Sequence, residues 1–212
     1  MVITWYGQSC FKIQSGETVI FTDPFDKSIG LTPPRGAANI VTVSHQHLDH
    51  NNVAALNGEP LVVEGPGEYE TKGVSVKGIF SFHDDKEGKE RGANTIFMLE
   101  VEGIKICHLG DLGQKKLTDE QLEHIDEADI LMIPVGGVFT VDAEEAAEII
   151  NQIEPRIVIP MHYKIPGLEM KLAGVDDFLK EMGAAKKETV DKLTLKKKDL
   201  SQDDTQVVVM KI

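Results

Sequence analysis

Hydrophobic and polar positions alternate with a period of two along several stretches of the first half of the chain. Because successive side chains of a strand face opposite sides of a sheet, this alternation predicts short strands separated by turns. The expected strands cover residues 2–6, 10–14, 19–22, 40–44, 61–63, 74–80, 95–101 and 104–108. The first half of the chain is therefore expected to be rich in β-sheet.

The second half combines strand-like runs with helical patterns. Strands are expected at residues 130–134, 156–160, 192–196 and 206–211, and helices after Thr140 and near residues 175–182. Thr140 can cap the first of these helices, and the acidic side chain of Asp142 suits its positive end. One face of that helix would carry an apolar stripe formed by Ala143, Ala146, Ala147, Ile150 and Ile153.

This mixture of strands and helices favours one domain over residues 1–212, of the mixed α/β (α+β) class. We expect two mixed sheets that pack face to face, with helices on their outer faces. The hydrophobic fraction of 41% is adequate for one core. Apolar stretches are too short to span a bilayer, and the N-terminus lacks the pattern of an export signal. We therefore expect a cytoplasmic protein without membrane contact.

The charge balance argues against nucleic acid as a partner, because a formal net charge of -13 repels phosphate backbones. The only basic cluster, formed by Lys196, Lys197 and Lys198, is interpreted as a solvated turn, since acidic residues follow it. Cys10 and Cys107 lie in apolar runs without a partner at metal-ligand spacing. Both thiols are expected to be reduced, buried and inert.

The candidate chemistry follows the β-branched run at residues 39–44, where the chain continues as His45-Gln46-His47-Leu48-Asp49-His50. Residues two apart in an extended segment point the same way, so His45 and His47 can bind one ion together. A following turn would direct Asp49 and His50 toward a second ion. Imidazole and carboxylate groups are zinc ligands, and catalytic zinc lowers the pKa of bound water to about 7.

Two more polar residues follow predicted strands and could complete such a site. Asp111 lies in a glycine-flanked turn after residues 104–108, and His162 follows the strand at 156–160. Taken singly, Asp111 could instead cap a turn, and His162 could be a packed histidine.

Taken together and in this order, these segments resemble the metallo-β-lactamase superfamily. The segments are Thr22-Asp23-Pro24, the run from His45 to His50, Gly110-Asp111 and Pro160-Met161-His162-Tyr163. Within the superfamily, residues 5–11 and 91–95 are similar to short single-domain hydrolases of the ascorbate-6-phosphate lactonase-like group. The resemblance implies a four-layer αββα sandwich with metals at one edge of the two sheets.

The resemblance also implies which residues bind metal. The implied ligands are His45 and His47 for the first ion, Asp49, His50 and His162 for the second, and Asp111 as the bridge between them. The first ion needs a third histidine, for which His83 is preferred to His108 because Asp111 already occupies the turn after His108.

Two residues are expected to act next to the ligands. Asp23 would orient one of the ligands, although an ordinary Asp-Pro turn is the alternative. Gln8 departs from relatives that carry histidine at this position near the metal edge. Because glutamine cannot exchange protons near neutral pH, proton delivery to a leaving group is in question.

The expected activity is metal-dependent hydrolysis, in which metal-bound hydroxide attacks a small anionic ester, lactone or phosphodiester and Asp49 positions the nucleophile. Two divalent ions are expected, zinc first, with manganese or iron as alternatives. Arg91, Asn94 and Lys164 could contact the substrate, although turn or surface roles suit them equally well. The helix start after Gly136 could hold an anion. The alternatives are a nucleic-acid-processing endonuclease of the same fold and a non-catalytic metal or ligand sensor.

Overall fold

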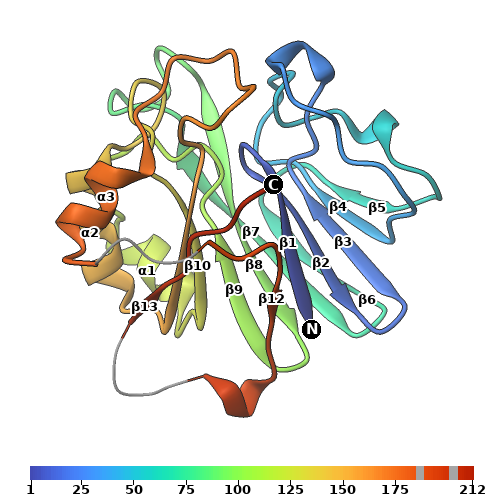
Figure 1. The fold of residues 1–212 in the computed structure, drawn as a ribbon. Coiled ribbons are helices and arrows are strands. Elements are labelled where there is room, and N and C mark those ends of the chain that lie inside the picture. Colours follow the sequence, from blue (N-terminus) through green and yellow to red (C-terminus); the bar gives the residue numbers. More distant parts are fainter. Residues whose placement is uncertain (185–188, 201–204) are drawn as a thin grey trace.

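Two mixed β-sheets lie face to face in the computed structural model, which describes residues 1–184, 189–200 and 205–212 (Figure 1). Among these residues, the six-stranded sheet has the order β12-β1-β2-β3-β4-β5, with β1 Val2–Gly7, β2 Cys10–Ser15, β3 Thr18–Thr22, β4 Ile40–Thr42, β5 Leu61–Val63 and β12 Leu193–Thr194. The seven-stranded sheet has the order β13-β11-β10-β9-β8-β7-β6, with β6 Gly67–Thr71, β7 Val74–Phe82, β8 Ala93–Val101, β9 Ile104–His108, β10 Ile130–Pro134, β11 Ile157–Met161 and β13 Gln206–Val207.

Strand directions bring many carboxyl ends to one edge of the sandwich. Strands β3, β4 and β5 are parallel, and β1 shares their direction because β2 is antiparallel to both β1 and β3. In the other sheet β9, β10 and β11 are parallel, and β7 shares their direction through β8. The loops that leave these strands lie at the top of the sandwich in Figure 1. Ligands of open α/β sheets bind outside such carboxyl ends.

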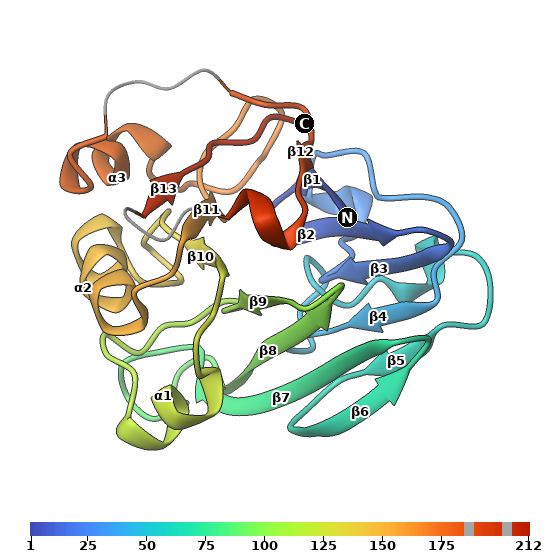
Figure 2. The same cartoon turned by 90° about the horizontal axis from the view of Figure 1, so that it is seen from below.

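Three α-helices of the described residues lie beside the seven-stranded sheet in both views (Figures 1 and 2). They are α1 Asp119–Ile125, α2 Ala143–Ile153 and α3 Val175–Glu181, and short 3-10 turns occur at η1 Lys27–Ile29, η2 Val53–Ala55 and η3 Lys197–Asp199. Helix α1 contacts β7, and α2 contacts β10. The two mixed sheets and flanking helices agree with the predicted class.

The burial of side chains along a strand depends on whether one or both faces of the strand are covered. In β1, Ile3 and Trp5 are buried, whereas Thr4 and Tyr6 between them are half-buried. Strands β10 and β11 are buried along their whole length, as expected for parallel strands covered on both faces. Alternating apolar residues in the sequence therefore indicate a strand with one buried face, and a continuous apolar run indicates a strand that is buried on both faces.

The prediction that Thr140 caps α2 is wrong. Asp142 caps this helix, because its Oδ1 accepts from Glu145 N at 3.0 Å and Glu145 Oε2 accepts from Asp142 N at 3.1 Å. Thr140 belongs instead to a tight turn, in which its N–H donates to the carbonyl of Gly137 at 3.5 Å. The Asp142 carboxylate thus supplies a negative charge at the positive end of α2.

Several other expectations concern the surface and the thiols. The late strands are shorter than predicted, and Lys197 of the basic cluster pairs with the buried Asp129 at 2.6 Å. Cys10 and Cys107 are free and buried, and burial raises the pKa of both thiols. Within the described ranges, no helix has the length and apolar character to cross a membrane.

Candidate metal centre

One edge of the sandwich collects the polar residues that follow the strands. Gln8 follows β1, Asp23 follows β3, the run from His45 to His50 follows β4, His83 follows β7, Asp111 follows β9 and His162 follows β11. These residues are far apart in the sequence, and the shared strand direction brings them together. The ligand atoms of the histidines, Asp49 and Asp111 form two adjacent groups.

The first group contains His45, His47 and His83, which offer ligand atoms within 4.8 Å of one another. His45 and His83 are buried, whereas His47 is exposed. Burial, followed by the charge of His50, lowers the pKa of His45 to about 3. A neutral imidazole is the form that binds a metal ion, so this group suits a cation.

The second group contains Asp49, His50, Asp111 and His162, again with ligand atoms within 4.8 Å. Nε2 of His50 lies 3.2 Å from Oδ2 of both Asp49 and Asp111, and Nε2 of His162 lies 3.1 Å from Oδ2 of Asp111. Ligands about 2.0–2.1 Å from a tetrahedral ion are about 3.3 Å from one another. The observed separations match that spacing.

Asp111 lies between the two groups. In addition to its contacts in the second group, its Oδ2 is 3.5 Å from Nε2 of His83. The carboxylate is buried, with 2% of the residue exposed. Its position would allow it to bridge two ions.

The buried polar atoms of the site fit a bound cation. Nε2 of His45, His50 and His162 are buried and have no hydrogen-bond partner among the described residues. Burial alone would lower the pKa of His50, but the charges of Asp111 and Asp49 raise it well above its usual range. Burial alone would raise the pKa of Asp111, but His162 and His50 hold it well below its usual range. A divalent ion would satisfy these nitrogens and neutralise the carboxylates.

Asp23 orients two of the candidate ligands. Its Oδ2 lies 2.9 Å from Nδ1 of His50 and 2.6 Å from the hydroxyl of Ser44, which is 3.0 Å from Nδ1 of His45. A carboxylate only accepts, so Nδ1 of His50 donates, and the Ser44 hydroxyl that donates to Asp23 accepts from His45. Both rings therefore carry a proton on Nδ1, which leaves Nε2 as the atom that a metal ion would bind. Sequence reasoning found Asp23 but missed Ser44.

The turn that holds Asp111 depends on Asn94. Asn94 is completely buried, its Oδ1 accepts from Asp111 N at 3.0 Å and its Nδ2 donates to the carbonyl of Leu109 at 2.9 Å. A Cβ on Gly110 would lie 2.4 Å from Asn94 Oδ1, and Gly110 has φ +57°, so glycine is required there. Ser9 also donates to Asp111 Oδ1 at 3.2 Å. Asn94 thus stabilises the turn that presents Asp111, as one of the two predicted roles requires.

His108 lies outside both groups of ligand atoms. It is completely buried, and its Nε2 lies 2.8 Å from the carbonyl oxygen of Ser9. The structure therefore brings His83, and not His108, next to His45 and His47.

The two basic candidates for substrate contact, Arg91 and Lys164, donate to backbone carbonyls. Arg91 donates to the carbonyl of Val138 at 3.3 Å and lies over the ring of Phe139 at 5.6 Å. Lys164 Nζ donates to the carbonyls of Leu168 and Met170. Both side chains hold loops at the metal edge in place.

The loop that follows His83 is organised by Asp84. Its buried carboxylate accepts from four backbone N–H groups, those of Lys86, Gly88, Glu90 and Arg91, at 2.7–3.0 Å. We expect Asp84→Ala to lower the free energy of unfolding of the metal-free protein by about 1–3 kcal/mol, because these donors lose a charged acceptor. Urea unfolding would measure the change. The control is Asp85→Ala at the exposed neighbouring residue, and equal midpoints for both variants would contradict the prediction.

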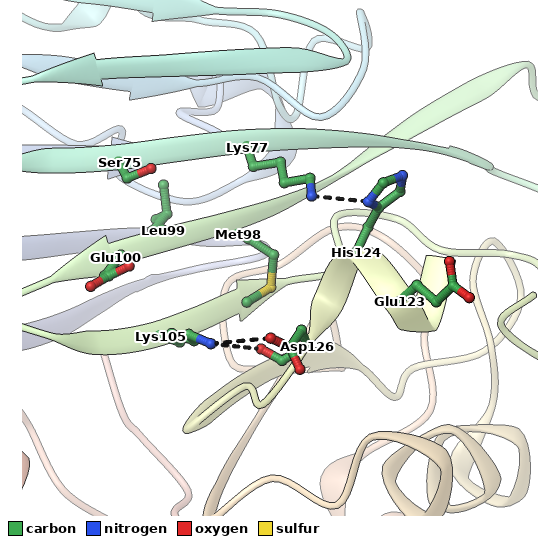
Figure 3. A pocket seen from close by; sticks show the side chains of 9 residues that line it. All are labelled: Ser75, Lys77, Met98, Leu99, Glu100, Lys105, Glu123, His124 and Asp126. Atoms are coloured by element: carbon green, nitrogen blue, oxygen red, sulfur yellow. Dashed lines mark hydrogen bonds and ion pairs between the residues drawn. The ribbon is translucent and has the colours of Figure 1, made fainter. Parts of the chain in front are cut away.

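A hollow of about 230 Å³ lies away from the metal edge, on β7, β8, β9 and the end of α1 (Figure 3). Lys77 Nζ lies 2.9 Å from Nδ1 of His124, and Lys105 pairs with Asp126 at 3.5 Å. Glu100 and Glu123 also line it. Its charged side chains largely compensate one another. None of its lining residues has a buried polar atom without a hydrogen-bond partner, in contrast to the metal edge.

Comparisons with known proteins cover the segments that form the candidate site. Residues 2–162 match a family profile described as the β-lactamase superfamily domain. A UPF0173 metal-dependent hydrolase from Thermoplasma acidophilum is 32% identical, with 76% of this chain and 82% of that protein aligned. A UPF0173 metal-dependent hydrolase from Methanoculleus marisnigri is 30% identical, with 77% and 81% aligned. A crystal structure from Thermotoga maritima, described as a candidate Zn-dependent hydrolase of the metallo-β-lactamase superfamily, is 40% identical, covers 99% of this chain and 97% of its own, and has a TM-score of 0.80.

Proposed function

This chain belongs to the metallo-β-lactamase superfamily and is a metal-dependent hydrolase, and from that premise we propose that it uses two zinc ions to cleave a small anionic ester, lactone or phosphodiester. The two adjacent groups of ligand atoms carry the proposal. His45, His47 and His83 would hold the first ion. Asp49, His50 and His162 would hold the second, with Asp111 between them. Zinc suits this supply of imidazoles, and manganese or iron are the alternatives.

The protein residues would divide the chemical work. When bound, the ions supply an activated water and stabilise negative charge on the attacked group. Asp49 is the least buried member of its group, with 16% of its side chain exposed. Its named contacts use Oδ2, which leaves Oδ1 to accept the proton of the attacking water. The leaving group also needs a proton, which Gln8 cannot supply. We propose that solvent or the substrate protonates the leaving group.

The substrate class follows from the charge of the protein. At a net charge of -13, long-range attraction for a polyanion such as nucleic acid is absent. The two-cation centre would provide a local attraction for a single anionic group. We therefore propose a small-molecule substrate. We also propose that the protein is cytoplasmic and forms one domain.

Metal removal tests the proposal. Protein purified without added metal is expected to contain about two ions per chain, measured by mass spectrometry. Chelation should abolish hydrolysis of bis(p-nitrophenyl) phosphate or of a panel of lactones, and added zinc should restore it. Complete inactivity on the panel with two ions bound would contradict the proposed reaction.

A histidine pair tests the ligand assignment. We expect His47→Ala to lose one ion, whereas His124→Ala should retain both, because exposed His124 lies on α1 and outside the two ligand groups. Equal metal content in both variants would show that His47 is not a ligand.

A further inference from the structure

Gln8 occupies the turn between β1 and β2 in an unusual conformation. Its φ of 51° lies in the left-handed region, which is unfavourable for a residue that carries a Cβ. The residue is completely buried. Strained residues persist where surrounding contacts determine them, and such positions concentrate at functional sites.

The contacts of Gln8 reach two members of the second ligand group. Its side-chain Nε2 donates to Asp49 Oδ2 at 2.8 Å, the same oxygen that lies 3.2 Å from Nε2 of His50. Its backbone carbonyl accepts from His162 N at 3.2 Å and from the indole of Trp5 at 3.0 Å. One residue therefore fixes both the Asp49 carboxylate and the backbone of His162.

A structural role alone does not explain this side chain. Oε1 of Gln8 is buried without a hydrogen-bond partner among the described residues, and an unsatisfied buried acceptor is unfavourable for folding. Exchanging nitrogen and oxygen would place the carbonyl oxygen against Asp49, which repels it. The observed orientation therefore leaves one unfavourable atom in order to supply a donor to Asp49.

We propose that Gln8 is a positioning residue for the second ion, which it serves by holding Asp49 and His162 while remaining neutral at every pH at which the protein is folded. The inference rests on the proposed function, since it concerns the second of the two ions. Among the contacts of the described residues, those of Gln8 do not include His45, His47 or His83. The first ion should therefore be independent of Gln8.

Cobalt titration of the metal-free protein, followed by visible absorbance, tests this proposal. Gln8→Met keeps the length of the side chain and removes both polar atoms. We expect it to weaken one of two Co²⁺ affinities by about 10–100-fold, the usual effect of losing a residue that orients a ligand, and to leave the other unchanged. The metal-free variant should unfold at the wild-type temperature or above it, because the unsatisfied Oε1 is gone.

Two further variants complete the experiment. Gln14→Met makes the same change in an exposed glutamine of β2 that donates to the carbonyl of Gly16, and should leave both affinities unchanged. Gln8→His restores a ring N–H of similar reach and should bind the second ion more tightly than Gln8→Met.

Other outcomes would overturn the proposal. The proposal is wrong if Gln8→Met leaves both affinities unchanged or weakens both ions equally. It is also wrong if the metal-free variant unfolds at a lower temperature than the wild type, or if Gln8→His binds the second ion as weakly as Gln8→Met. Failure of the proposed function looks different, since the wild type itself would then bind fewer than two Co²⁺ ions, and that result would overturn both proposals.

Discussion

Replacing Asp111 by alanine is expected to remove most of the bound metal and to lower hydrolysis about 10³-fold or more. Its Oδ2 lies 3.2 Å from His50 Nε2, 3.1 Å from His162 Nε2 and 3.5 Å from His83 Nε2, so its loss affects both groups of ligands. Losing several kcal/mol of charge stabilisation corresponds to that factor at about 1.4 kcal/mol per tenfold. Metal content per chain and initial rates on bis(p-nitrophenyl) phosphate would measure both effects.

Asp129 provides a matched control for the removal of a buried carboxylate. It is 3% exposed, close to the 2% of Asp111. Asp129 precedes β10 and therefore lies at the amino end of that strand, whereas the metal edge is formed at the carboxyl ends. It pairs with Lys197 at 2.6 Å. Asp129→Ala should therefore destabilise the protein and retain both ions. If the two variants lost metal equally, the effect of Asp111→Ala would come from general destabilisation and not from a lost ligand.

The strands and most ligand positions were predictable because the signals are local. The β-branched run before His45 forms β4 and releases the histidines at its carboxyl end. Asp111 and His162 likewise follow apolar runs that form β9 and β11. A strand needs only its own residue pattern to be recognised, and parallel strands bring their ends to one edge.

Strand β6 and helix α1 were missed for different reasons. Strand β6 contains Glu68 and Glu70 and lies at an edge, so it is held by pairing with β7 more than by buried side chains. Helix α1 contains only two apolar residues, Leu122 and Ile125, which are too few to show a period. Its one signal is the capping box of Thr118 and Gln121, which could have been found in the sequence.

The residues that orient the ligands depend on tertiary structure. Ser44 follows β4 and Ser9 follows β1, and neither belongs to a motif with a spacing that indicates its partner. Ser44 becomes important because Asp23 lies beside it, and Ser9 because the other sheet brings Asp111 within 3.2 Å. Likewise, nothing in the sequence shows that Gln8 contacts Asp49. Contacts between distant segments set these roles, and a single sequence does not contain them.

Replacing Asp23 by asparagine is expected to weaken both ions, each by about 10–100-fold. Asp23 accepts from Ser44 N on Oδ1, and from the Ser44 hydroxyl and His50 Nδ1 on Oδ2. An asparagine has only one acceptor oxygen, so in either orientation its NH₂ group faces a donor. The least costly adjustment moves the proton of His50 to Nε2, the atom that faces Asp111, where it blocks metal binding. His45 is affected through the same hydroxyl.

Comparison of the two polar supports makes this prediction specific. Gln8→Met should weaken one ion, because the side chain of Gln8 contacts only Asp49 among the ligands named here, whereas Asp23→Asn should weaken two. Cobalt titration separates the patterns, with Asp26→Asn as the control at a half-buried carboxylate that caps η1 and lies outside both ligand groups. Asp23→Asn that binds two ions with wild-type affinity would show that Asp23 does not set the ring protons. Loss of the second ion alone would show that the Ser44 hydroxyl does not transmit the change to His45.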